Sequence, residues 1–130
     1  MLQIHQGVDI VEVTRFKKVF QKNKDLASDV FTEKERAYCL SRKDPYIHFA
    51  GRFAAKEACL KALGMGLSTG IDHTLREIEV LASASGKPVL SVKGWAARTS
   101  KRQKINQLTV SISHSANYAV ATVILVGNKN

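Results

Sequence analysis

The sequence predicts an α+β fold in which an antiparallel β-sheet packs against one long central helix, within a single domain over residues 1–130. Residues 49–66 repeat their apolar side chains at helical spacing and end at glycine. Residues 75–92 are typical of a hairpin, and residues 108–126 of two further strands. A chain of 130 residues, 45 % of them hydrophobic, is long enough to bury one core.

Charge is unevenly distributed along this basic chain. The formal net charge is +9, and residues 80–130 carry seven basic side chains and no acidic one. Such a field attracts phosphate-bearing or acidic partners, and nucleic acid is the simplest alternative. The longest apolar run, residues 118–126, is too short to span a bilayer. We also expect no secretory leader, because the first residues are not a basic segment followed by an apolar one. Since Cys39 and Cys59 lack a Cys-x-x-Cys spacing, we expect reduced thiols in a cytoplasmic protein.

The N-terminal segment, residues 2–13, is expected to be a strand that carries an acid on an apolar face. Asp9 shares its side of the strand with Val11 and Val13. A buried carboxylate is costly unless it is paired or bound to metal. A salt bridge to a basic neighbour and a metal site are therefore both open interpretations. Gly7 indicates a bulge or a close backbone approach.

Residues 15–23 are expected to form a short helix with a basic ridge beside its apolar side chains. The buried stripe is expected to contain Phe16, Val19 and Phe20. The basic ridge consists of Arg15, Lys18 and Lys22. A basic helix face is often only solvated, but the absence of interleaved acids favours a dock for an acidic surface. Further on, Thr32 and Glu35 have the spacing of a capping box that begins a helix ending near Leu40.

The central helix carries two pairs of polar residues at one-turn spacing. Arg52 and Lys56 are expected on one edge of its apolar stripe, and Glu57 and Lys61 beyond the other edge. The apolar stripe contains Phe49, Phe53, Leu60 and Leu63. Small residues surround the second pair, namely Ala50, Ala54 and Ala58. The pair could merely stabilise the helix, or the alanines could let a large group approach it.

The C-terminal half is expected to complete the sheet. Residues 75–82 and 87–92 form the hairpin, and residues 95–104 a basic helix. Residues 108–113 alternate in polarity and lead to His114, whereas residues 118–126 are apolar on both faces and should be the central strand. We expect one antiparallel sheet made from the N-terminal strand, the hairpin and the last two strands.

These residue types favour phosphoryl chemistry. Asp9 and Glu57 suit a hard cation such as Mg²⁺, which commonly binds one or two protein carboxylates together with substrate phosphate. Lys61 could neutralise that phosphate and Arg52 could bind a second one. His114 could be a base, a phosphate ligand or a structural residue. The residues alone therefore indicate Mg²⁺-assisted phosphoryl transfer on a polyphosphate substrate.

Five segments together resemble one enzyme family closely, the holo-acyl-carrier-protein synthases, which are bacterial 4′-phosphopantetheinyl transferases. The segments are GVDIVEVTRF at 7–16, FTEKERAYC at 31–39, GRFAAKEACLKALGMG at 51–66, SGKPVL at 85–90 and VSISHSANYAVATV at 110–123. The resemblance implies Mg²⁺-dependent transfer of the 4′-phosphopantetheine arm of coenzyme A to a serine of apo acyl carrier protein. Adenosine 3′,5′-bisphosphate would be released, and the reaction would support fatty acid biosynthesis.

The resemblance also implies roles for individual residues. Asp9 and Glu57 would bind the metal, Lys61 the pyrophosphate, and Arg52 and His114 the 3′-phosphate side of the nucleotide. The family's hairpin motif beside the nucleotide matches Gly86, Lys87 and Pro88. The acidic helix of the carrier protein would meet Arg15, Lys18 and Lys22. The family's short members are homotrimers with active sites at subunit interfaces, so we expect a homotrimer here too.

Several alternatives remain open at the level of sequence. The serine proton could pass to a metal-bound water, a carboxylate or His114. The chain departs from the family pattern at His5 and Met65, neither of which is an implied ligand. A nucleic-acid-binding domain would bind without Mg²⁺ and tolerate Asp9→Asn, and a metal-dependent phosphodiesterase would need no carrier protein. A two-metal nuclease is disfavoured, because the sequence offers only two obvious carboxylates for the site. We expect neither nucleic acid nor membrane as a partner.

Overall fold

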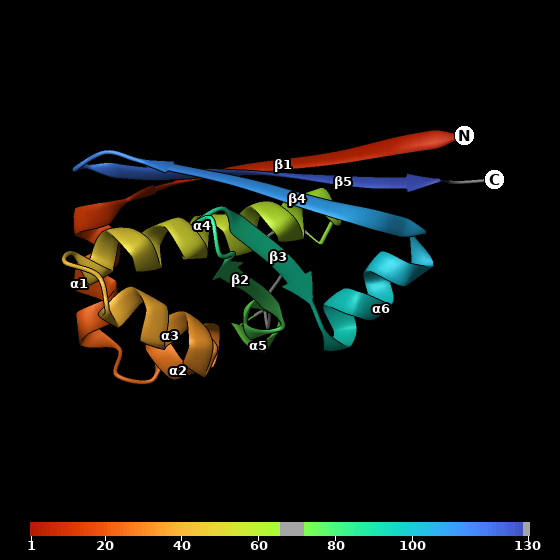
Figure 1. The fold of residues 1–130 in the computed structure, drawn as a ribbon. Coiled ribbons are helices and arrows are strands. Elements are labelled where there is room, and N and C mark those ends of the chain that lie inside the picture. Colours follow the sequence, from red (N-terminus) through yellow and green to blue (C-terminus); the bar gives the residue numbers. More distant parts are fainter. Residues whose placement is uncertain (66–71, 129–130) are drawn as a thin grey trace.

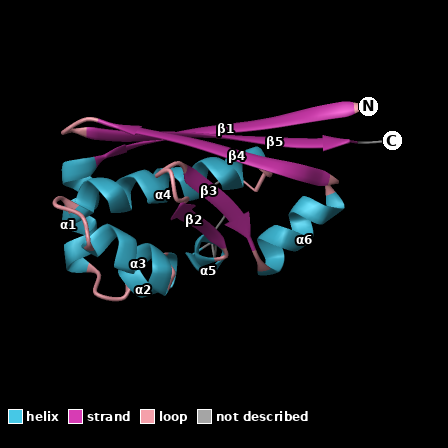
Figure 2. Cartoon of the chain, in the orientation of Figure 1, coloured by secondary structure: helices cyan, strands magenta, loops and turns pink. Residues whose placement is uncertain are grey.

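The computed structural model describes residues 1–65 and 72–128, in which helices lie on one side of a long sheet (Figures 1 and 2). The elements, in chain order, are β1 (Leu2–Glu12), α1 (Val13–Lys22), α2 (Leu26–Val30), α3 (Glu33–Leu40), α4 (Pro45–Ala62), α5 (Asp72–Arg76), β2 (Ile78–Ala82), β3 (Pro88–Val92), α6 (Gly94–Arg102), β4 (Ile105–His114) and β5 (Tyr118–Asn128). Helix α4 runs beneath the sheet, and both chain ends lie at the same end of it (Figure 1). No helix in the described ranges is long and apolar enough to cross a membrane.

Strands β1, β5 and β4 form an antiparallel sheet in that order. The central position of β5, predicted from its two apolar faces, is confirmed. The predicted 75–92 hairpin also forms, but its inclusion in the main sheet was wrong, since β2 and β3 pair only with each other. Strand β2 begins at Ile78, later than predicted, because the short helix α5 precedes it.

Helix α4 packs closely on the sheet through small residues. Ala54 and Ala58 are fully buried, and so are Ala119 and Ala121 on the facing side of β5, to within 1 %. A Cβ added to Gly7 would lie 1.9 Å from the carbonyl oxygen of Ala58, so only glycine permits this approach. The close approach predicted at Gly7 is confirmed. The alanines therefore do let a large group approach the helix, as predicted, and that group is the chain's own sheet.

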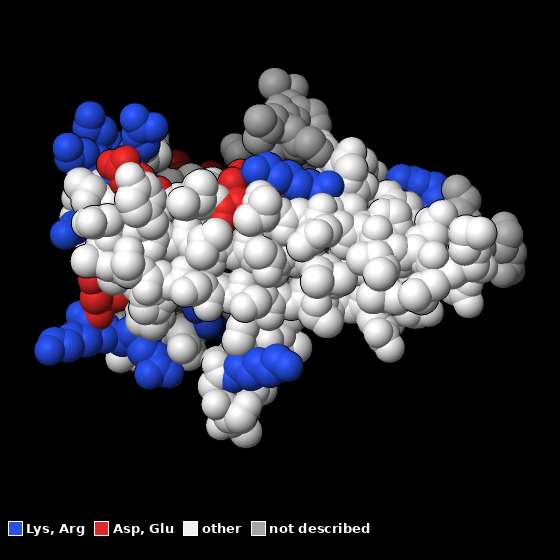
Figure 3. Space-filling view, turned by 90° about the horizontal axis from the view of Figure 1, so that it is seen from above, with Lys and Arg blue, Asp and Glu red and all other residues white. Residues whose placement is uncertain are grey.

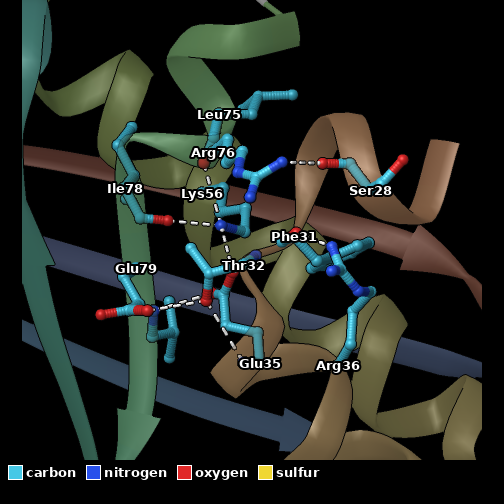
Figure 4. Close-up of polar contacts among 11 residues, drawn as sticks. Ser28, Phe31, Thr32, Glu35, Arg36, Lys56, Leu75, Arg76, Ile78 and Glu79 are labelled. Atoms are coloured by element: carbon cyan, nitrogen blue, oxygen red, sulfur yellow. Dashed lines mark hydrogen bonds and ion pairs between the residues drawn. The ribbon is translucent and has the colours of Figure 1, made fainter. Parts of the chain in front are cut away.

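A buried ion pair holds the other side of α4 (Figure 4). Lys56, which was predicted to lie on the edge of the apolar stripe, is fully buried. Its ammonium donates to Glu35 Oε1 at 2.8 Å, to the Leu75 carbonyl at 2.9 Å and to the Ile78 carbonyl. All three of its N–H donors thus have acceptors. Periodicity could not predict this burial, because the acceptors come from other elements.

Glu35 ties α3 and β2 into the same cluster. The capping box predicted for Thr32 and Glu35 is confirmed, with Thr32 N donating to Glu35 Oε1 at 2.9 Å. The second carboxylate oxygen accepts from Val80 N of β2 at 2.8 Å. Glu35 is itself fully buried. The carboxylate therefore joins α3, α4 and β2 at one point.

Element bounds differ modestly from those predicted. Helix α4 begins at Pro45, which occupies its first turn as predicted, and ends at Ala62 ahead of Gly64, whose φ is +76°. Val19 was predicted to be buried in α1 but is 46 % exposed, because α1 presents Phe16 and Phe20 to the aromatic core and leaves Val19 facing outward. The loop that follows α4 was expected to continue through Thr69 and Gly70, which lie outside the described residues.

The outer face of the main sheet is apolar along β1, and none of the described helices covers it (Figure 1). Exposed β1 side chains on that face include Leu2, Ile4, Val8 and Ile10, which are 54–66 % exposed. Their partners across the β1–β5 ladder include Val126, Thr122 and Val120. Seen from that side, the middle of the molecule is almost free of charged residues, and the basic side chains lie around its margin (Figure 3). An apolar face of this extent indicates an interaction surface.

We expect Lys56→Met to destabilise the fold by about 3–5 kcal/mol, because the buried Glu35 carboxylate would lose its counter-ion. Urea denaturation followed by circular dichroism measures this change. Lys61→Met is the matched control, since the Lys61 ion pair with Asp9 is 40 % exposed on the lysine side. The control should cost less than about 1 kcal/mol. Equal losses in both variants would contradict the role given to the buried pair.

Candidate active site

Asp9 and Glu57 line the same cleft, of about 530 Å³, between β1, α1 and α4. Asp9 lies on the helix-facing side of β1, and its Oδ1 accepts from Lys61 Nζ at 3.1 Å. The same ammonium donates to the Val8 carbonyl at 3.0 Å. The predicted group of Asp9, Glu57 and Lys61 is thus brought together, with the salt bridge formed to Asp9.

The rest of the cleft is largely apolar and opens beside the basic ridge. Its apolar lining consists of Ile10, Val11, Phe16, Val19, Leu26, Phe53 and Tyr118. Arg15 lines the cleft as well, whereas Lys18 and Lys22 lie outside its lining, on the exposed part of α1. The predicted exposure of all three ridge residues is confirmed. The cleft therefore combines acids, an apolar wall and a basic rim.

The donor set of the cleft fits Mg²⁺ held jointly by protein and substrate. Asp9 and Glu57 supply two carboxylates, and no group of three or more metal-binding side chains occurs within the described residues. Mg²⁺ commonly binds through one or two carboxylates and completes its shell with water and substrate phosphates. A closed, all-protein metal site would need more ligands than these two residues provide.

A second cluster, which we term the cationic cluster, lies on the opposite flank of α4. It consists of Tyr38, Arg42, His48, Arg52 and His114. The Arg52 guanidinium lies 4.1 Å from the Tyr38 ring centroid, and that of Arg42 lies 4.5 Å from the same centroid. Arg52 is only 6 % exposed, and its Nε has no hydrogen-bond partner. Among the described residues no carboxylate forms a salt bridge with either arginine.

Two histidines complete the cationic cluster. The rings of His48 and His114 lie 5.6 Å apart between centroids, in a T-shaped arrangement. Burial lowers the pKa of His48, and the nearby charges of Arg52, His114 and Arg42 lower it further. The sequence predicted Arg52 and His114 but missed Tyr38, Arg42 and His48. The spacing of His48, one helical turn before Arg52, was the available signal.

The two groups cannot serve one small ligand within a single chain. Arg52 and Glu57 lie about 140° apart around α4, given 3.6 residues per turn. Asp9 and His114 lie on the outer strands β1 and β4, whose backbones are about 10 Å apart with β5 between them. These distances leave two half-sites on opposite flanks of the helix.

The predicted hairpin motif lies apart from both the cleft with Asp9 and Glu57 and the cationic cluster. Gly86 has a φ of +87°, a conformation that favours glycine, and forms the turn. Lys87 and Pro88 line a separate cavity of about 330 Å³. Its other walls come from the main sheet and include Thr109 and Ser111 of β4. This motif therefore touches neither the acidic cleft nor the cationic cluster in the described chain.

Comparison with known proteins identifies the family. The model for the 4′-phosphopantetheinyl transferase superfamily matches residues 6–123. The chain belongs to this superfamily. It is 45 % identical over 123 residues to the holo-acyl-carrier-protein synthase of Syntrophotalea carbinolica, covering 94 % of each chain. The predicted resemblance and the prediction of a transferase are thereby confirmed.

Solved structures confirm the fold prediction. The Chronobacterium ammoniagenes ACPS–CoA complex superposes with a TM-score of 0.84 at 29 % identity, covering 98 % of this chain and 99 % of that one. A holo-acyl-carrier-protein synthase from Bacillus anthracis in complex with CoA (3′,5′-ADP) superposes with a TM-score of 0.78 at 32 % identity, covering 98 % and 100 %. The transferase therefore has the α+β fold of these enzymes.

We expect Arg52→Met to leave the thermal unfolding midpoint unchanged or to raise it. The substitution removes a buried charge that has no carboxylate partner and replaces it with an apolar side chain of similar length. Differential scanning calorimetry measures the midpoint. Lys56→Met, one turn along the same helix, is the matched control and should lower it. A large loss of stability in Arg52→Met would mean that the guanidinium is satisfied by the protein itself.

Proposed function

We propose that this transferase moves the 4′-phosphopantetheine arm of coenzyme A onto a serine of apo acyl carrier protein and releases adenosine 3′,5′-bisphosphate. The observation that carries the proposal is the presence of Asp9 and Glu57 in one cleft beside the basic ridge, with Lys61 bonded to Asp9. That arrangement provides a cation site, a phosphate contact and a dock for an acidic partner. The relatives named above are holo-acyl-carrier-protein synthases, and one of them is a CoA complex.

In this proposal Asp9 and Glu57 hold Mg²⁺ and Lys61 binds the pyrophosphate of coenzyme A. Bound Mg²⁺ would neutralise the charge that builds on the leaving nucleotide. The serine oxygen forms a new bond to the phosphorus that carries pantetheine, and the phosphoanhydride bond to the nucleotide breaks. Lys61, which already bonds to Asp9, lies where it can contact both the carboxylate and the phosphate.

The serine proton must leave during this step, and two kinds of side chain in this protein could accept it. A carboxylate in the cleft is one of them. His114 is the other, but it lies on β4, across the sheet from Asp9. For His114 to act as the base, it would therefore have to come from a neighbouring copy of the chain.

The cationic cluster would bind the 3′-phosphate of coenzyme A. Arg52 is a buried guanidinium without a carboxylate partner in the described ranges, and His114, at the end of β4, contacts His48 one turn before Arg52. The positive charge of this guanidinium could pair with an anionic ligand. Gly86, Lys87 and Pro88 would lie beside the nucleotide, as the family resemblance implies, with the exposed turn facing the ligand.

The carrier protein would dock on α1. Arg15, Lys18 and Lys22 are all exposed, and the first of them also lines the acidic cleft. An acidic helix on this ridge would bring its serine to the metal side of the cleft. The apolar lining around Phe16 and Phe53 would bury the apolar residues of the docking helix.

A homotrimer would join the two half-sites. Within one chain the acidic cleft and the cationic cluster lie on opposite flanks of α4, so a complete site needs two copies in a head-to-tail arrangement. The uncovered outer face of the sheet, around Ile4 and Ile10, supplies an apolar surface for such an interface. Rings close when the rotation between copies is a simple fraction of a turn, and three copies is the number that the family resemblance implies.

A cytoplasmic location and a role in fatty acid biosynthesis complete the proposal, with residues 1–130 acting as a single domain. Cys39 and Cys59 are free and buried, which fits a reducing compartment. Burial raises the pKa of Cys39 to about 11 and that of Cys59 to about 12, so neither thiol is suited to be a nucleophile.

Intact mass spectrometry of apo acyl carrier protein, incubated with coenzyme A, Mg²⁺ and this protein, tests the reaction. We expect a gain of one phosphopantetheine group, and Asp9→Asn or Glu57→Gln should slow that gain by about 100-fold or more. A chelator should abolish it, and added Mg²⁺ should restore it. If several apo carriers gain no mass with a folded enzyme, the proposed reaction is wrong. Full activity in the presence of the chelator would exclude the Mg²⁺ requirement but would leave the proposed transfer reaction intact.

Mixing two inactive variants tests whether the site spans two copies. Asp9→Asn damages one half-site and Arg52→Met the other, so co-refolded chains should form some interfaces with both halves intact. Random assembly in a head-to-tail ring restores about one quarter of the sites, and therefore about that fraction of activity. Size-exclusion chromatography with light scattering should give a trimer mass, which Ile10→Lys on the outer face should reduce. No recovery on mixing would mean that each site lies within one chain.

A further inference from the structure

His48 is a titratable residue of the cationic cluster to which the proposed reaction gives no role. It lies in α4, one turn before Arg52, and is partly exposed. Its ring contacts His114 across a centroid distance of 5.6 Å and Tyr38 across 6.0 Å, both in T-shaped arrangements. The imidazole therefore stands between the buried guanidinium and the end of β4, where it can reach a ligand bound to both.

The charged groups around His48 come from α4, from the segment before it and from β4, and they are mostly positive. Arg52 lies on its own helix, Arg42 precedes that helix, and His114 ends β4. Among the described residues, the Asp44 carboxylate at the N-cap of α4 is the one negative group that acts on His48, and the Tyr38 ring from α3 is neutral. Burial and these cations together lower the pKa of His48. The imidazole is thus neutral near pH 7 while the cluster holds no anion.

A doubly charged phosphate would reverse this balance. A phosphate monoester carries close to two negative charges at pH 7, since its second pKa is about 6. Placed against Arg52 and His114, it offsets the cations that keep His48 neutral and favours protonated imidazole. Protonated imidazole has two N–H donors, whereas neutral imidazole has one. The gain of a proton therefore adds both a charge and a hydrogen-bond donor at the ligand.

We propose that His48 is a specificity-determining contact for the 3′-phosphate monoester of the nucleotide, and that it takes up a proton from solvent when that phosphate binds. The proposal rests on the proposed function, because it assumes that the cationic cluster receives the 3′-phosphate of coenzyme A. It goes further by naming a residue outside the predicted ligands and a proton linked to binding. The site would then select nucleotides that end in a phosphate monoester over those that lack it.

Coenzyme A and 3′-dephospho-coenzyme A form a matched ligand pair for the test, since they differ only in this phosphate. Isothermal titration calorimetry at pH 7, in two buffers of different protonation enthalpy, counts the protons taken up by each. We expect the wild-type protein with Mg²⁺ to bind additional protons with coenzyme A compared with the dephospho form, with a maximum of about one proton per site. The preference for coenzyme A in kcat/KM should rise as the pH falls from 8 to 7.

His48→Phe should remove the additional proton and reduce the preference for coenzyme A by about tenfold. His48→Arg is the conservative control, because it carries a permanent charge. This variant should keep most of the preference, without its pH dependence and without proton uptake. A purely structural role for the imidazole would instead change both substrates alike in every variant.

Three results would overturn the inference. Unchanged proton uptake and preference in His48→Phe would exclude the residue, and loss of uptake in His114→Phe alone would assign the proton to that histidine. Failure of the wild-type protein to prefer coenzyme A would show that the cluster does not read the 3′-phosphate. In each of these cases transfer from coenzyme A can still proceed, whereas absence of any transfer would refute the proposed function itself.

Discussion

The buried contact between Lys56 and Glu35 determines where helix α4 lies, and through it where the acids of the cleft lie. Lys56 brings its ammonium to acceptors from α3 and from the segments around α5 and β2, while Gly7 lets β1 touch the helix backbone on the other side. Buried ion pairs contribute little net stability compared with apolar packing. Their geometric demands are strict, however, because a displaced partner would leave a buried charge unpaired. Since Glu57 follows Lys56 directly in the chain, its position is set by the same contact.

Helix α4 also separates opposite charges that would otherwise cancel. The acids and Lys61 lie on one flank, while Arg52 and the histidines lie on the other. If both groups shared a flank, Arg52 would pair with a carboxylate of its own chain, and neither would remain available to ligands. With the helix and its alanine-lined contact to β5 between them, each group keeps its charge. A substrate that carries both a pyrophosphate and a distant phosphate could then satisfy the two groups in adjacent copies.

Much of this arrangement follows from local pattern, and the failures share one cause. Period-two alternation correctly put Asp9 on the inner face of β1, and the apolar run of β5 correctly indicated a central strand. The burial of Lys56 was not predicted, because helical periodicity describes one helix and says nothing of acceptors supplied by other elements. The burial predicted for Val19 was wrong for a related reason, since a short helix at the end of a sheet buries a narrower stripe than its apolar residues suggest. The cationic cluster joins α3, α4 and β4, so only the fold could assemble it.

The unpartnered guanidinium of Arg52 links stability to ligand binding. Nearly full burial removes it from water, yet its Nε has no acceptor and its main contact is the Tyr38 ring. A protein selected only for stability would replace such a group, because desolvating an unpaired charge is unfavourable. In the proposed site a bound phosphate would supply an acceptor, and part of its binding free energy would then relieve a cost already present in the free chain. Anything that binds the folded state alone stabilises it in proportion to the logarithm of its concentration. In the proposed site, the burial of Arg52 is therefore a cost to the free chain that a bound phosphate would offset, and a nucleotide without that phosphate would not offset it.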